Sequence, residues 1–233
     1  MTLPCIDIHS HFFPKRAPNF AEKFGEGSGP WVTLQDHGDG TGMMMLGEKP
    51  FRPVHSALWD AKARVAEIDA SNVSTQIMCA TPVMFAYDAP AEQAAHVAAT
   101  YNDLALEMCA ESGGRLKALA QVPLQDSELS MKELSRAMRA GCVGVQIGNH
   151  VGPREMDDEG TVRFLAHCAA EGAAVLVHPW DMLGGERLKR WMSAWTVAMP
   201  AETQFGIMAM ILGGAFDQLP RDLRICFAHG GGG

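Results

Sequence analysis

Four of the nine histidines lie at the ends of short apolar runs. His9 and His11 stand two positions apart in IDIHSHF, and a strand projects such residues to one face, about 6 to 7 Å apart along the chain. His178 ends the run AVLVH, and His229 ends LRICFAH next to a string of glycines. Imidazole nitrogens are common ligands of divalent ions. The pattern therefore predicts a metal site, with zinc favoured by imidazole ligation and an open position available for water.

Other residues have two open interpretations. His-x-His alone is also compatible with two hydrogen-bonded histidines at a strand end, and His150 in VGVQIGNH fits either support of the site or a structural role. Arg52 in KPFRPV could bind a substrate carboxylate through both guanidinium nitrogens, or it could be a solvated surface residue. Trp180, Trp191 and Trp195 follow the third histidine and fit either a core or an aromatic wall beside a planar ligand.

The elements that position these residues follow an alternating pattern. Apolar, strand-like runs alternate with helix-like segments, as in βα units around a parallel sheet. Such a fold places its site at the carboxyl ends of the strands. The predicted strands are 4–12, 73–81, 116–124, 142–150, 174–180 and 223–230, and the predicted helices are 60–70, 90–112, 127–140, 158–171 and 186–214. We therefore expect an α/β fold of the (β/α)8 barrel type, with about six of its eight units in this chain.

One segment interrupts this alternation. Residues 13–59 are rich in Gly and Pro and contain GTGMMMLGEKPFRPV, which predicts a small antiparallel flap inserted after the first strand. Insertions at the carboxyl end of a barrel strand lie over the active site. The rest of the chain, residues 1–233, is interpreted as one domain.

The amino-acid composition argues against some classes of binding partner. The 233 residues include 19 Lys and Arg against 27 Asp and Glu, a net charge of −8, which argues against nucleic acid and anionic membranes as partners. The amino terminus lacks the order of a secretory signal, and no uninterrupted apolar stretch reaches membrane-spanning length. The six cysteines are scattered without a CxxC pair, so we expect free thiols and a cytoplasmic protein.

Taken together, the motifs resemble those of the 2-amino-3-carboxymuconate-6-semialdehyde decarboxylase family in the amidohydrolase superfamily. The likeness extends over essentially the whole chain, through IDIHSHFFP, FRPVHSALWD, CATPVMFAY, LAQVPLQD, GVQIGNH, LVHPWDMLGGERLKRW, AMPAETQ and ICFAHGGG. It implies a zinc-bearing (β/α)8 barrel, commonly homodimeric. It also implies cofactor-free decarboxylation of a dicarboxylate semialdehyde in kynurenine and 3-hydroxyanthranilate or nitrobenzoate degradation.

The resemblance also implies a role for each candidate residue. His9, His11 and His178 match the family's zinc ligands, His229 its acid/base histidine, Arg52 its carboxylate-binding arginine, and Trp195 a tryptophan that lines the substrate site. A fourth ligand, an aspartate after the last strand, has no counterpart before Gly233. We therefore expect an incomplete chain of a normal enzyme. The alternatives are another decarboxylase or hydrolase of the superfamily, and a truncated metal-binding chain without activity.

Overall fold

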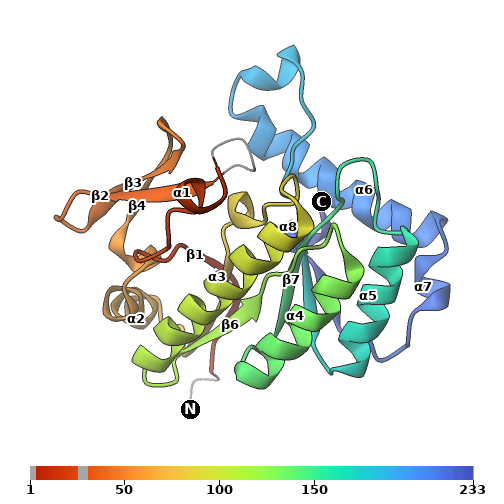
Figure 1. Cartoon of the computed structure of the whole chain (residues 1–233), viewed down its shortest axis with the longest axis horizontal. Helices are drawn as coiled ribbons and strands as arrows, with labels where there is room; N and C mark the ends of the chain where they lie inside the picture. Colours follow the sequence, from red (N-terminus) through yellow and green to blue (C-terminus); the bar gives the residue numbers. More distant parts are fainter. Residues whose placement is uncertain (1–3, 26–30, 233) are drawn as a thin grey trace.

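A computed structural model describes residues 4–25 and 31–232 (Figure 1). Its main sheet has six strands in sequential order, and every neighbouring pair is parallel. Sequential parallel order is the arrangement that repeated βα units produce around a barrel, so the expected fold class is confirmed. The strands are β1 (Ile6–Phe12), β5 (Thr75–Ala80), β6 (Leu116–Ala120), β7 (Gly144–Gly148), β8 (Ala174–His178) and β9 (Ile225–Phe227).

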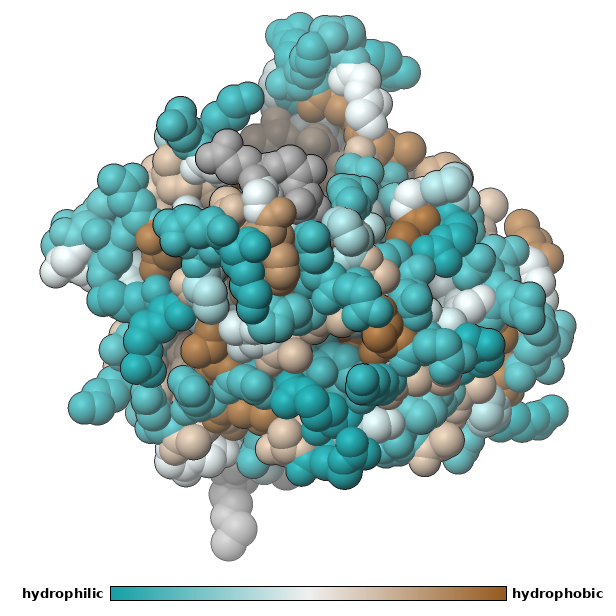
Figure 2. Space-filling view, in the orientation of Figure 1, coloured by the Kyte–Doolittle hydropathy of each residue, from teal (hydrophilic) through white to brown (hydrophobic). Residues whose placement is uncertain are grey.

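Side-chain caps mark the start of several helices between these strands. Aspartate side chains cap three of them: Asp60 accepts from the N–H of Ala63, Asp126 from that of Leu129, and Asp158 from those of two residues in its first turn. Three helices lie in front of the sheet in Figure 1, and their outward face is mostly hydrophilic in Figure 2. The helices are α2 (Ala61–Ala70), α3 (Ala91–Glu111), α4 (Ser127–Ala140), α5 (Glu159–Ala170), α6 (Met199–Leu212), α7 (Ala215–Gln218) and α8 (Ala228–Gly231), the three in front being α3, α4 and α5.

The sheet is strongly curled. In a flat sheet, β1 and β8 would lie about four strand spacings apart, roughly 19 Å. Instead, the imidazole rings of His9 on β1 and His178 on β8 have centroids 5.0 Å apart. Only a strongly curled sheet brings side chains from those two strands together. The curling therefore builds the site from residues that are far apart along the chain.

The segment after β1 forms a separate small sheet. It contains α1 (Phe20–Phe24) and three antiparallel strands, β2 (Val32–Asp36), β3 (Thr41–Leu46) and β4 (Lys49–His55). In Figure 1 this sheet stands to one side of the curled sheet. Residues 26–30 of the predicted insertion lie outside the described residues. β4 is followed by a short 3-10 turn (Ser56–Leu58) that leads to α2. The carbonyl oxygen of Leu58 in this turn accepts from the N–H of Phe13, directly after β1, at 3.0 Å.

The expected helix over 186–214 is wrong as a single element. The segment forms a 3-10 turn (Glu186–Lys189), a π-helical turn (Ala194–Ala198) and then α6. Trp191 and Met192 have φ angles of 56° and 54°, which no α-helix contains. Pro200 lies in the first turn of α6, where its missing N–H is not needed, so the regular helix begins there.

No helix among the described residues is both long enough and apolar enough to span a membrane.

Candidate metal centre and active site

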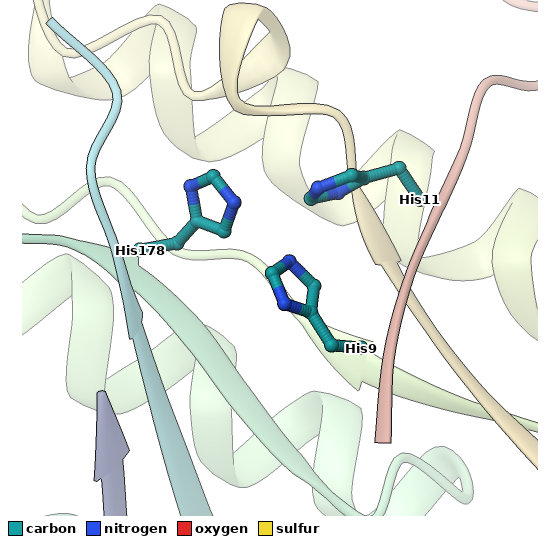
Figure 3. Close-up of side chains that lie close together, drawn as sticks. All are labelled: His9, His11 and His178. Atoms are coloured by element: carbon teal, nitrogen blue, oxygen red, sulfur yellow. The ribbon is translucent and has the colours of Figure 1, made fainter. Parts of the chain in front are cut away.

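Three imidazoles converge inside the curled sheet. His9 and His11 come from β1, and His178 comes from the last position of β8. One nitrogen from each ring lies within 4.8 Å of those of the other two. Figure 3 shows the three rings facing a common space. This is the geometry that three ligands of a single ion require, and the sequence pattern placed the same residues together.

In two of the three rings, hydrogen bonds determine which nitrogen is free to bind a metal. Nδ1 of His11 lies 3.0 Å from the carbonyl oxygen of Ala80, and Nδ1 of His178 lies 2.6 Å from that of Pro179. A carbonyl only accepts, so Nδ1 of each ring carries the hydrogen and Nε2 keeps its lone pair. Nε2 of His178 is buried without a hydrogen-bond partner. An orphaned lone pair beside two other imidazoles fits a metal ligand.

Burial keeps these rings neutral. It lowers the pKa of His11 to about 4 and that of His178 to about 2, and neighbouring imidazoles add to both shifts. Burial also lowers the pKa of His9, although the nearby Asp7 carboxylate opposes the shift. Imidazole binds a metal only in its neutral form. At neutral pH the cluster therefore offers lone pairs without first releasing protons.

His229 completes the cluster from another direction. Its ring centroid lies 4.7 Å from that of His178 and 5.2 Å from that of His9, and its Nδ1 is buried without a partner. Its φ of 55° is unusual for a residue with a side chain, and such strain costs on the order of 1–3 kcal/mol. The loop is anchored at Gly232, where a Cβ would lie 2.3 Å from the carbonyl oxygen of Pro200. The left-handed turn thus directs the imidazole toward the other three.

Three of the four histidines, His11, His178 and His229, line a cavity of about 530 Å³ whose walls are largely apolar. Arg52 reaches it from β4, and Trp195 reaches it from the π-helical turn. The guanidinium carbon of Arg52 lies 4.8 Å from the centroid of the Trp195 ring, a cation–π contact. The residues that line the cavity are His11, Phe51, Arg52, Thr81, Pro82, Val83, Ala86, His178, Pro179, Trp180, Asp181, Met182, Trp195, Met199 and His229.

The structure distinguishes between the two interpretations of Trp180, His150 and Trp191. Trp180 lines the cavity, and its Nε1 donates to the carbonyl oxygen of His150 at 2.8 Å. His150 lies outside the cavity, with Nδ1 3.0 Å from the carbonyl oxygen of Gly152. It therefore supports a wall of the cavity. Trp191 is 77% exposed and stacks with Arg190, whose guanidinium carbon lies 4.4 Å from the ring, so it is neither core nor cavity wall.

Arg64, which the sequence patterns did not single out, lies directly behind β1, the strand that carries His9 and His11. Its guanidinium is buried and donates to the carbonyl oxygen of His11 at 2.5 Å. Burial lowers its pKa to about 10, so the group stays charged at neutral pH. One signal was available, because Ala61, Arg64 and Ile68 follow the i, i+3, i+7 spacing of a buried helix face. A charged residue on such a face indicates a buried polar contact.

Comparisons with known proteins identify the family of this chain. The amidohydrolase family model matches residues 6–233. The chain is 40% identical over 228 residues to 2-amino-3-carboxymuconate-6-semialdehyde decarboxylase from Dictyostelium discoideum, a match that covers 97% of this chain and 63% of that protein. The chain thus spans somewhat less than two thirds of the relative's length.

Solved structures share the fold. The apo form of IDCase from Metarhizium anisopliae superposes with a TM-score of 0.80 at 22% identity, over 98% of this chain and 66% of that one. A 5-carboxyvanillate decarboxylase from Novosphingobium aromaticivorans, solved with manganese and a nitrobenzoic acid, gives a TM-score of 0.73 at 20% identity, over 98% and 66%. The family match, the curled parallel sheet and the histidine cluster lead to one conclusion: this chain belongs to the amidohydrolase family, as a relative of 2-amino-3-carboxymuconate-6-semialdehyde decarboxylase.

Proposed function

We propose that this chain holds the catalytic centre of a zinc-dependent carboxy-lyase that converts 2-amino-3-carboxymuconate-6-semialdehyde to 2-aminomuconate-6-semialdehyde and carbon dioxide. One observation carries the proposal. Three neutral imidazoles and a fourth histidine cluster together, and three of these four rings line a mostly apolar cavity that an arginine also reaches. The name of the 40% identical relative supports this substrate over other carboxylic acids.

In this proposal His9, His11 and His178 hold the ion. Three imidazoles form a borderline-soft donor set that suits zinc, whereas the decarboxylase from Novosphingobium was solved with manganese. A bound divalent ion supplies Lewis acidity and lowers the pKa of a water that it coordinates toward about 7. The carbonyl oxygens of Ala80 and Pro179 keep two of the rings in the orientation that presents Nε2.

The remaining residues bind the substrate and move a proton. Arg52 would bind a substrate carboxylate, and Trp195 beneath its guanidinium would pack on the flat conjugated chain. Loss of carbon dioxide breaks a carbon–carbon bond and leaves an electron pair on carbon, which must then accept a proton. Burial lowers the pKa of His229, so this imidazole is unprotonated at neutral pH. It would accept a proton from solvent water and donate that proton to the carbon once carbon dioxide has left.

Two alanine variants test this division of roles in the full-length protein. His178→Ala should lose bound metal, because it removes a ligand, whereas His229→Ala should keep the metal and lose turnover. Metal content is measured by plasma mass spectrometry, and turnover by the absorbance of freshly generated substrate against its spontaneous cyclisation. Equal metal loss in both variants would contradict the roles assigned to them.

Product analysis distinguishes the proposed reaction from a second possible function in the same family. The manganese-containing neighbour named a 5-carboxyvanillate decarboxylase favours an aromatic acid as the alternative substrate. Carbon dioxide released from aromatic acids, with none from the semialdehyde, would select that alternative. A product without carbon dioxide would indicate a hydrolase, and bound metal without any turnover would indicate a non-catalytic chain.

A further inference from the structure

The strand that carries two of the three clustered histidines is irregular. Among the described strands, β1 lies at an edge of the main sheet and pairs with β5 alone. Asp7 is opposite Gln76 and Ser10 is opposite Met78, so β1 contains one more residue than its partner over this stretch. The irregular stretch includes His9. A bulge disrupts the regular ladder and redirects side chains, so other contacts must fix the backbone between the two histidines.

Arg64 on α2 makes such contacts with the residues on the C-terminal side of the bulge. Its guanidinium donates to the carbonyl oxygen of His11 at 2.5 Å and to the hydroxyl of Ser10 at 3.2 Å. The same group donates to Oε1 of Gln76 at 2.9 Å and to the carbonyl oxygen of Ala57 at 2.6 Å. Four acceptors in different directions leave the guanidinium only one position.

A second chain of hydrogen bonds extends from Arg64 to the N-terminal side of the bulge. Gln76, already bonded to Arg64, donates through Nε2 to Oδ2 of Asp7 at 2.8 Å. Oδ1 of Asp7 accepts from the backbone N–H of His9 at 3.0 Å. The network thus bonds the backbone of both histidines, at the N–H of His9 and the carbonyl of His11.

The charge of Arg64 is not explained by an ion pair. Within the described part of the chain, no carboxylate oxygen lies within 4.0 Å of its guanidinium, and all four acceptors are neutral oxygens. The nearby carboxylates of Glu67 and Asp7 favour the charged form without contacting it. Burial of a cation without a directly bonded counter-ion is still costly, and a neutral side chain would hold α2 against the strand at lower cost. What a guanidinium adds is several donors in a fixed plane.

We propose that Arg64 is a positioning residue, which holds the β1 bulge so that the imidazoles of His9 and His11 face the same metal ion. The proposal rests on the proposed function, because it assumes that these histidines bind a metal. Arg64 itself touches neither the metal nor the substrate. Its loss should therefore weaken metal binding and distort the geometry of the bound ion while the three ligands remain present.

The test uses Co²⁺ as a spectroscopic probe. The purified protein is stripped of metal and titrated with Co²⁺ against a chelating competitor, and the visible absorption of the bound ion is recorded. We expect Arg64→Lys to bind Co²⁺ about 10- to 100-fold more weakly than the wild type, the usual effect of losing a group that supports the ligands. The shape and intensity of the absorption bands should change as well, because coordination geometry changes.

Arg115→Lys is the matched control. Arg115 also donates to backbone carbonyl oxygens, those of Ser74 at 2.6 Å and Val73 at 2.8 Å, at the end of β5 that lies away from the histidines. It should lower the thermal midpoint and leave Co²⁺ affinity and spectrum unchanged. Gln76→Met removes two hydrogen bonds of the network, those to Arg64 and Asp7, and leaves the other three bonds of Arg64 in place. It should show a smaller loss of affinity, which provides a second variant if Arg64→Lys folds poorly.

The outcomes separate this proposal from the proposed function. Wild-type protein that binds no Co²⁺ would overturn the metal site and the positioning role together. Wild-type binding with unchanged affinity and spectrum in Arg64→Lys and Gln76→Met would overturn the positioning role alone. Equal losses of Co²⁺ affinity in the Arg64 and Arg115 variants would also overturn it. They would show that reduced stability of the protein, and not the loss of a specific contact, weakens metal binding.

Discussion

Gly148 ends β7 directly opposite His178 in the register of the sheet, and we expect Gly148→Ala to be strongly destabilising. A Cβ at this position would lie 2.6 Å from Cδ1 of Trp180 and 2.8 Å from Cε2 of Tyr87. Neither ring is free to move away. The Tyr87 hydroxyl accepts from the N–H of Gly148 at 3.0 Å, and Nε1 of Trp180 is bonded to His150.

The magnitude follows from these contacts. Inserting a methyl group into a packed site costs about 1–3 kcal/mol, and a lost hydrogen bond at Tyr87 adds about 1 kcal/mol. The expected loss in the free energy of unfolding is therefore about 2–4 kcal/mol, which lowers the thermal midpoint of a chain this size by roughly 4–16 °C. Because Trp180 lines the cavity, KM for the substrate should rise, while the histidine ligands and the metal content remain unchanged.

Thermal and urea unfolding, followed by circular dichroism, measure the effect. Gly184→Ala is the matched control, because a Cβ at Gly184 meets no atom within 4 Å and should change stability little. Our reasoning would be refuted by a Gly148→Ala variant as stable as the Gly184→Ala variant. A large loss of metal in the Gly148 variant, without a change in KM, would contradict the placement of the perturbation at the cavity wall.

The remaining predictions concern acid stability and substrate binding. Metal-free protein should lose stability as the pH falls from 6.5 toward about 4. In that range unfolded histidines bind protons while folded His11 stays neutral, so the unfolded state binds more protons and is favoured. Urea unfolding at several pH values measures this, and His11→Gln should show a weaker dependence; identical profiles would contradict it. Arg52→Ala should raise KM about tenfold, the lower end expected for a charge-assisted hydrogen bond at an exposed side chain, and leave metal content unchanged. Steady-state kinetics checks this, with Arg52→Lys as an intermediate, and an unchanged KM would exclude Arg52 from the site.

The strands and their order were predictable because buried parallel strands are almost continuously apolar. Runs such as CVGVQIGNH and AVLVHPW identify β7 and β8 to within a few residues, and helix caps such as Asp126 mark the following helices. The prediction failed over 186–214, where apolar composition alone suggested one helix. The interruption there arises from backbone conformations at Trp191 and Met192 that no local helix signal predicts.

The candidate site was partly predictable for a related reason. A histidine at the end of an apolar strand indicates the carboxyl edge of a parallel sheet, so the positions of His9, His11, His178 and His229 in the sequence are enough to group them. Arg64 could not be grouped with them. Its role depends on the bulge in β1, and no periodicity in sequence reports where one strand contains an extra residue relative to another.

By itself, the sequence determined the residue types, the apolar periodicity of the strands and the turn signals, and these specify a parallel sheet with histidines at one edge. Only the tertiary structure decided the distances. The curling of the sheet brings β1 and β8 together, the left-handed turn directs His229 into the cluster, and the buried Arg64 bonds the bulged strand. The physical reason is that periodicity encodes which face of an element is buried, whereas coordination geometry depends on how several elements pack at once.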